Sequence, residues 1–159
     1  GLRFINIAEE VNKGLALVTF FGHSAPTTQD FDIGYVSSAV LGYNNPGKYP
    51  VLLMNGCDAG DLFLNTQVTG ENWVLTPNKG AIAFIAHSAF GFVSTLQQYT
   101  NIFYEVNFSD SLFVNAGLGS VQNELGRRFL SRFGDAEFSI SQVQQMTLQG
   151  DPAVKLFSA

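Results

Sequence analysis

The stretch PVLLMNGC, residues 50–57, joins an uninterrupted apolar run to a small polar turn that ends in the only cysteine of the chain. The run from Val51 to Met54 does not alternate with polar residues, as a strand with one solvent-exposed face would. A continuous run of this kind is typical of a parallel strand that helices cover on both faces. The stretch therefore predicts a buried strand with Cys57 just beyond its carboxyl end.

The same pattern occurs once before and once after this stretch. A run from Leu15 to Phe21 leads to Gly22-His23, and a run from Ala81 to Ala86 leads to His87. Other segments have helical spacing or turn residues, and they predict helices at 2–13, 70–75, 95–105 and 120–133, a loop with a short helix at 30–41, and a last strand at 146–148. This order favours one domain, residues 1–159, with an α/β fold: a three-layer α/β/α sandwich around a mainly parallel sheet.

The composition describes a core-rich domain with few charges. Of 159 residues, 46% are hydrophobic and 13% charged, and the formal net charge is -5. Basic residues do not cluster beyond Arg127-Arg128, so the electrostatic footprint of a nucleic-acid partner is missing. No apolar run approaches the roughly 20 residues of a membrane span, and residues 1–14 do not resemble a secretory signal. A single cysteine excludes an intramolecular disulfide and a multi-cysteine zinc site; we predict no metal and no cofactor.

His23, Cys57 and His87 each follow the end of a predicted strand. Ligand sites in parallel sheets lie beyond the carboxyl ends of the strands, and neighbouring strands are only ~4.8 Å apart. If these strands are neighbours, the three side chains converge. The simpler interpretation is that every strand is followed by a loop and that some loops contain His or Cys.

Ser24 is one candidate nucleophile, because Gly22-His23-Ser24 resembles the start of a Gly-x-Ser-x-Gly elbow. Ser24, Asp58 and His87 even follow the chain order of a serine-hydrolase triad. However, Pro26 replaces the last glycine of the elbow, and no amphipathic helix follows it. This interpretation is the less favoured one.

Cys57 is the stronger candidate, since a thiol is the better nucleophile at neutral pH and a nearby imidazole activates it further. Its turn, Asn55 to Gly60, is small and polar and predicts an accessible sulfur, whereas a structural cysteine usually lies within an apolar run. Spacing alone does not decide whether His23 or His87 is the base.

Four blocks of the sequence, in order, resemble the gingipain-type cysteine peptidases, relatives of the caspases in fold that include peptidase domains of bacterial secretion-system proteins. The blocks are LVTFFGHSA (17–25), PVLLMNGCDAGDLF (50–63), GENWVLTPNKGAIAFIAHS (70–88) and LQGDPAVKLF (148–157). The resemblance implies a caspase-like fold and a cysteine endopeptidase acting on peptides or proteins. It also implies an extracellular or cell-envelope location.

The resemblance assigns roles to individual residues. It implies Cys57 as the nucleophile, His23 as the general base and acid, and an oxyanion hole formed by the backbone N–H groups of Cys57 and Ser24. His87 and Ser88 would line the pocket for the substrate side chain before the scissile bond. Asp58 or Asp61 could orient His23, although both are more typical of solvated turn residues.

The sequence also departs from the family pattern. Ser24 stands where the family has glycine, and the pocket loop HSAFGFVSTLQQ, residues 87–98, contains no acidic residue, which favours an apolar or small substrate side chain over a basic one. We expect the chain to be the C-terminal portion of a larger peptidase domain and to pack against the N-terminal part. A non-catalytic caspase-like scaffold in a secreted or surface protein is the alternative function.

Overall fold

Three parallel strands and one antiparallel strand form the central sheet of the computed structural model, which describes residues 2–156. The sheet order is β2 (Leu17–Phe21), β6 (Val51–Asn55), β7 (Ala83–His87) and β8 (Met146–Gly150), and only β8 is antiparallel to its neighbour. The three predicted apolar runs are therefore neighbouring parallel strands, with their carboxyl ends at one edge. The last predicted strand is also present and is two residues longer.

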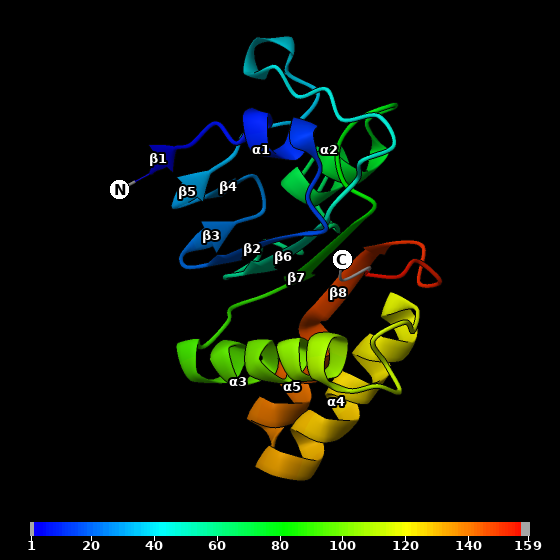
Figure 1. The fold of residues 1–159 in the computed structure, drawn as a ribbon. Helices are drawn as coiled ribbons and strands as arrows, with labels where there is room; N and C mark the ends of the chain where they lie inside the picture. Colours follow the sequence, from blue (N-terminus) through cyan, green and yellow to red (C-terminus); the bar gives the residue numbers. More distant parts are fainter. Residues whose placement is uncertain (1, 157–159) are drawn as a thin grey trace.

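Helices cover both faces of this sheet and make three layers (Figure 1). One face carries α1 (Ala8–Lys13) and α2 (Thr69–Leu75), and the other carries α3 (Val93–Tyr104), the π-helical η2 (Glu105–Ser109), α4 (Leu118–Phe133) and α5 (Glu137–Gln145). The predicted α/β/α sandwich is confirmed. Within residues 2–156, no helix has both the length and the apolar character to cross a membrane.

Several short elements differ from the sequence expectation. The helix expected at 2–13 starts only at Ala8, because residues 3 and 4 form β1 (Arg3–Phe4) beside β5 (Phe31–Asp32). Arg3 N–H donates to Asp30 O and Ile5 N–H to Asp32 O, so backbone pairing with a distant segment outweighs the local helical spacing. The segment 30–41 contains β5 and a 3₁₀ turn, η1 (Ala39–Leu41). A short hairpin of two strands, β3 (Ser24–Ala25) and β4 (Thr28–Gln29), follows His23.

Burial along the strands follows their position in the sheet. Every residue of β6 and β7 is buried, as the continuous apolar runs predict. Strand β2 is at the edge, and its Thr19 and Phe21 are exposed. The expectation of cover on both faces is therefore correct for β6 and β7 and wrong in part for β2.

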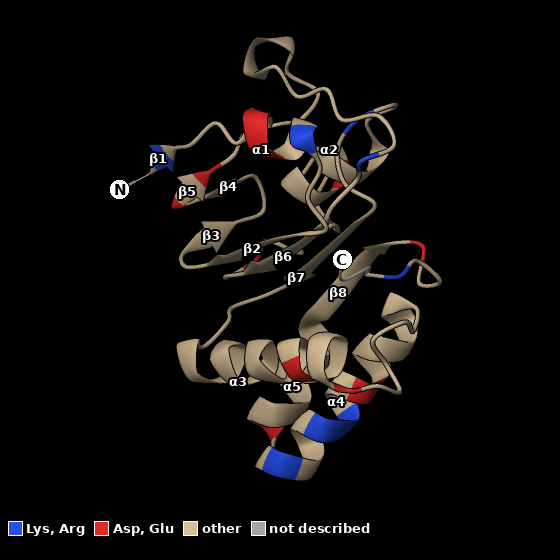
Figure 2. Cartoon of the chain, in the orientation of Figure 1, with Lys and Arg blue, Asp and Glu red and all other residues tan. Residues whose placement is uncertain are grey.

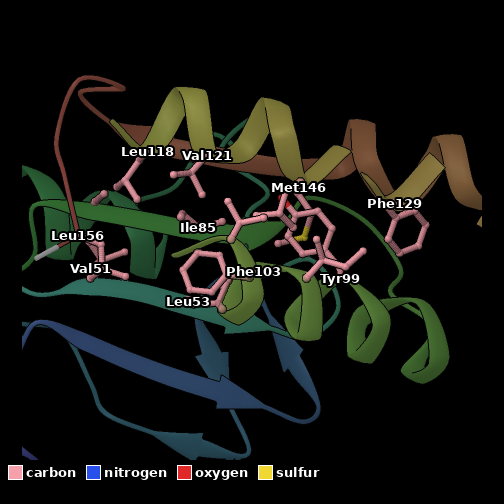
Figure 3. Close-up of a cluster of buried hydrophobic side chains, with 14 of the residues drawn as sticks. Val51, Leu53, Ile85, Tyr99, Phe103, Leu118, Val121, Phe129, Met146 and Leu156 are labelled. Atoms are coloured by element: carbon pink, nitrogen blue, oxygen red, sulfur yellow. The ribbon is translucent and has the colours of Figure 1, made fainter. Parts of the chain in front are cut away.

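The two faces of the sheet are the centres of two apolar clusters. On the face of α3 and α4, strand residues such as Leu53 and Ile85 pack against Phe103, Val121 and other helix residues (Figure 3). On the opposite face, Trp73 of α2 is fully buried and stacks edge-on against Tyr43 with ring centroids 4.8 Å apart.

Gly80 fixes the connection between α2 and β7. Its φ is +108°, a conformation that L side chains rarely adopt, and a Cβ built on it would lie 2.0 Å from the carbonyl oxygen of Trp73. That oxygen accepts a hydrogen bond from Ala81 N–H at 2.8 Å. A side chain at position 80 would therefore force the end of α2 away from β7.

Gly80→Ala should destabilise the chain more than Gly42→Ala. Gly42 also has positive φ, +75°, but a Cβ there meets nothing within 4 Å. The strained backbone alone should cost Gly42→Ala about 1 kcal/mol, and the collision should cost Gly80→Ala roughly 1 to 3 kcal/mol more. Urea unfolding of both variants measures the difference, and equal losses would contradict this account of Gly80.

An ion-pair network ties η2 to α4, where acidic and basic residues lie side by side (Figure 2). The Arg128 guanidinium donates to Glu105 and Glu124 at 2.7 Å each and also to Asp110. Arg132 donates to both carboxylate oxygens of Glu105. The hydrogen bonds from Arg132, followed by those from Arg128, lower the pKa of Glu105 to about 2.

This network should make stability fall with acid. The folded-state pKa of Glu105 lies below its ordinary value of 4.5, so its contribution is present above about pH 4.5 and is lost as pH falls toward 2. Glu105→Gln should flatten this part of a plot of Tm against pH relative to the parent chain. Glu10→Gln on α1 is the control, and the same flattening in both variants would refute the assignment to Glu105.

Candidate functional site

The carboxyl ends of β2, β6 and β7 lie side by side. Phe21 pairs with Asn55, and Met54 pairs with Ala86, so the turns that follow these strands start at the same level of the sheet. Gly22 N–H donates to Asn55 O at 3.0 Å and continues the ladder one residue beyond β2. The fold therefore brings the turns that carry His23, Cys57 and His87 to one edge.

The His23 turn is packed directly on the Cys57 turn. Ser24 Oγ donates to the carbonyl oxygen of Cys57 at 2.7 Å. Gly56 leaves the space for this contact, because a Cβ at Gly56 would lie 2.0 Å from Ser24 Oγ and 2.7 Å from the carbonyl oxygen of Gly22. Both neighbours of His23 in the chain thus contact the Cys57 turn.

The Cys57 turn is also anchored to the segment after β7. Asp58, which follows the cysteine, has φ of +56°, a conformation that costs a non-glycine residue energy and occurs preferentially at functional sites. Asp58 N–H donates to Ala89 O, and Gly60 N–H donates to His87 O, both at 2.9 Å. These bonds hold the turn in its strained conformation.

The sulfur of Cys57 contacts backbone rather than a charged side chain. Gly91 N–H donates to Sγ at 3.4 Å, and the thiol donates to the carbonyl oxygen of Gly91 at 3.6 Å. Cys57 is a free thiol of intermediate burial. Within residues 2–156, no hydrogen bond joins Sγ to the imidazole of His23 or His87.

His23 is exposed and stands at the start of the β3–β4 hairpin. Asp30 N–H donates to His23 O at 2.9 Å, which makes residues 23 and 30 a hydrogen-bonded pair of this antiparallel hairpin. The next pair, Ser24 and Gln29, is then a non-hydrogen-bonded pair. The N–H of Ser24 therefore points out of the β3–β4 ladder.

His87 is in a different position from His23. It is the last residue of β7 rather than a loop residue, it is 2% exposed, and its Nδ1 lies 2.7 Å from Ala89 O. Burial lowers the pKa of His87, and the hydrogen bond to Ala89 and the charge of Asp58 only partly offset this effect. Since a carbonyl oxygen accepts from Nδ1, the neutral ring carries its proton there and leaves Nε2 as an acceptor.

His87 lines a cavity of about 200 Å³ together with Phe90, Phe92 and Phe138. Ser88 does not contribute to this cavity; its N–H donates to Gln145 O at 2.7 Å. The cavity is not lined by Cys57 or His23. A separate depression of about 130 Å³ contains His23 and Ser24.

The geometry does not assemble the serine-hydrolase triad. The hydroxyl of Ser24 donates to Cys57 O and is not bonded to an imidazole. Asp61 accepts a hydrogen bond from Phe63 N–H, and the charge of Asp58 acts on His87. In the described part of the chain, neither aspartate hydrogen-bonds to His23.

Among residues 2–156, no three His, Cys, Asp or Glu side chains gather closely enough to hold a metal ion.

Sequence reasoning missed several residues of this edge. The contact that Gly56 permits has only a weak sequence signal, a glycine beside the cysteine. Gly91 had none, because its contact with Sγ joins residues 34 positions apart. Helix α5 had none either, because it reaches the end of β7 only through the pairing of β7 with β8. Asn55 lies two positions before Cys57, and the sequence assigned it only to the polar turn. Its side chain is 1% exposed, and its amide has no hydrogen-bond partner among the described residues.

Solved structures share this fold at low sequence identity. The crystal structure of the Arg-specific cysteine proteinase gingipain R (RgpB) superposes with a TM-score of 0.80 at 16% identity, over 95% of this chain and 35% of that one. The complex of Porphyromonas gingivalis RgpB pro- and mature domains gives 0.82 at 17% identity, over 94% and 36%. A third structure, described only as a protease, gives 0.76 at 16%, over 93% and 37%. The chain thus spans about a third of the length of these structures.

Comparison of the sequence with family models identifies a family, whereas comparison with individual curated proteins gives no match. The model of peptidase family C25 matches residues 3–157, which is nearly the whole chain. The chain therefore belongs to peptidase family C25.

Proposed function

We propose that this chain carries the nucleophile and the proton-transfer group of a cysteine endopeptidase, with Cys57 as nucleophile and His23 as general base and acid. The observation that carries the proposal is the contact between their two turns, from Ser24 Oγ to Cys57 O across Gly56. A thiol is the stronger nucleophile of the two candidates, and the hydroxyl of Ser24 is engaged elsewhere. Membership of a peptidase family supports the reaction class.

The reaction is an acyl transfer in two halves. The proton of the Cys57 thiol passes to the imidazole of His23, and the thiolate forms a bond to the carbonyl carbon of the substrate. The carbon–nitrogen bond then breaks, and His23 gives its proton to the leaving amine. Water attacks the thioester and gives a proton to His23, and the carbon–sulfur bond breaks to release the Cys57 thiolate. His23 then returns this proton to the sulfur, which restores the thiol and the neutral imidazole.

Backbone N–H groups of Cys57 and Ser24 are the proposed oxyanion donors. The hairpin register leaves the Ser24 N–H outside the β3–β4 ladder, as this role requires. One such donor is worth about 3 kcal/mol of transition-state stabilisation. The hydroxyl of Ser24 is turned toward Cys57 O, so the side chain that replaces the glycine of the family pattern holds the turns together rather than filling the oxyanion site.

The substrate is a peptide or protein, and the residue before the scissile bond is proposed to be apolar or small. Residues 88–92, which adjoin the sulfur, are predominantly apolar and carry no charge. Extracellular or cell-envelope location and packing against an N-terminal part of the same protein remain predictions from the family resemblance.

A non-catalytic role is the second candidate. The observation that favours it is the engagement of the Cys57 sulfur with Gly91 instead of an imidazole. In that case, this edge would serve assembly, and the thiol would not react faster than an ordinary cysteine.

Labelling with a peptidyl acyloxymethyl ketone should separate the two functions in the full-length protein. Cys57→Ser should abolish labelling, and His23→Ala should slow it by about 10²- to 10⁴-fold, because proton transfer is lost. The chain has two histidines, so His87→Gln tests the other possible base, and it should slow labelling much less than His23→Ala. Equal labelling of parent and His23→Ala would reject the proposal, and loss only in Ser24→Ala would favour the serine mechanism.

Gly56→Ala should reduce peptide cleavage by about 100-fold, since its Cβ would displace Ser24 and separate the two turns by about an ångström. Adding Ser24→Gly should restore part of the rate, because the closest clashing atom is then gone. Gly47→Ala, at a position of positive φ with nothing within 4 Å, is the control and should leave the rate unchanged. Full activity of Gly56→Ala would show that the spacing of the turns is not critical.

A further inference from the structure

Asp30 lies directly across the β3–β4 hairpin from His23. The register pairs Ser24 with Gln29, so the pair one step further from the turn is His23 and Asp30, and Asp30 N–H donates to His23 O at 2.9 Å. Directly opposite residues of an antiparallel pair have their side chains on the same face, with Cβ atoms roughly 5 Å apart. The carboxylate of Asp30 is therefore a cross-strand neighbour of the His23 imidazole.

The backbone of Asp30 is fixed on both sides. Its N–H donates to His23 O, and its carbonyl oxygen accepts a hydrogen bond from Arg3 N–H of β1 at 2.8 Å. The hairpin itself is held on the Cys57 turn by the hydrogen bond from Ser24 Oγ to Cys57 O. Asp30, His23 and the Cys57 turn therefore belong to one hydrogen-bonded unit, in which the position of Asp30 relative to His23 is well defined.

The carboxylate of Asp30 has no other task within residues 2–156. It forms no ion pair and no hydrogen bond with these residues, and Asp30 is only half-buried. Asp30 and His23 also line the same depression of about 130 Å³. By contrast, the carboxylate of Asp32, two residues later, accepts a hydrogen bond from Gly34 N–H at 2.8 Å. Asp30 is thus the aspartate of this hairpin that is available to the imidazole.

A side-chain rotation is sufficient to bring the two groups together. Within the described residues, the imidazole of His23 and the carboxylate of Asp30 are not hydrogen-bonded to each other. Hydrogen bonds between catalytic groups are often long in the free enzyme and shorten in the reacting complex. His23 is exposed, so its side chain has room to change rotamer. The backbone does not need to move, because the register already places the two residues opposite each other.

We propose that Asp30 is the residue that positions His23 for proton transfer, an inference that rests on the proposed cysteine-peptidase function. One ring N–H of His23 donates to the carboxylate of Asp30, and the other ring nitrogen stays free to accept the proton of the Cys57 thiol. When that proton arrives, the imidazolium forms beside the carboxylate, which keeps its negative charge throughout. When His23 gives the proton to the leaving amine, the imidazole returns to the tautomer that Asp30 holds.

Labelling of the full-length protein with the peptidyl acyloxymethyl ketone tests this role. Asp30→Asn should lower the labelling rate at saturating reagent about tenfold, the loss expected for a hydrogen bond to a charged group. The reagent concentration that gives half of the maximal rate should not change, because Asp30 contacts the histidine and not the substrate. Asp30→Glu, which keeps the charge, should recover part of the rate. Asp32→Asn is the matched control and should label at the parental rate, since an amide oxygen still accepts from Gly34 N–H.

A double variant separates positioning of His23 from a structural effect. In the His23→Ala background, Asp30→Asn should cause no further loss of labelling rate, because no imidazole is left to position. Additive losses of the two substitutions would overturn the proposal and give Asp30 a structural role. If His23→Ala slows labelling but Asp30→Asn labels as fast as the parent, the peptidase proposal stands and this inference alone fails. Equal labelling of the parent and His23→Ala would overturn both.

Discussion

One hydrogen bond, from Ser24 Oγ to the carbonyl oxygen of Cys57, holds the turn after β2 on the turn after β6. Gly56 makes it possible, because any side chain there would occupy the space of the hydroxyl. The parallel pairing of β2 and β6 is sufficient to bring the carboxyl ends of the two strands to the same edge of the sheet. The hydrogen bond fixes how the two turns face each other, and the placement of His23 relative to Cys57 depends on it.

The rigidity behind this contact comes from the buried strands. β6 and β7 are buried along their whole length between two apolar clusters, so their carboxyl ends have little freedom to move. Thr147 of β8 adds side-chain bonds to Gly60 O and Ala86 O and thereby ties the Cys57 turn to the sheet from the other side. By contrast, β2 is an edge strand, and His23 beyond it is exposed.

The sequence was sufficient for the three parallel strands of the central sheet and for the place of Cys57 beyond the end of β6, because a continuous apolar run between polar turns is typical of a buried parallel strand. It was insufficient wherever distant segments meet. Nothing local distinguishes the exposed edge β2 from the buried β6, and the two-residue strand β1 depends on pairing with β5, 28 residues later. The pocket loop predicted at 87–98 is a loop only between the end of β7 at His87 and the start of α3 at Val93. The cavity beside it includes Glu137 of α5, a helix that the weak periodicity of residues 137–145 did not predict.

The edge that carries Cys57 and His23 contains several residues whose conformation or lack of a partner costs stability. Asp58 has a left-handed backbone conformation, and three buried amides near this edge, those of Gln29, Asn55 and Gln142, lack partners within residues 2–156. Each departure costs stability that an apolar or glycine substitution would recover. Stability alone would not retain such residues beside a well-packed core. Asn55 and Asp58, which precede and follow Cys57 closely in the chain, are what a site requires if it keeps polar groups free for ligands and a strained turn in place for chemistry.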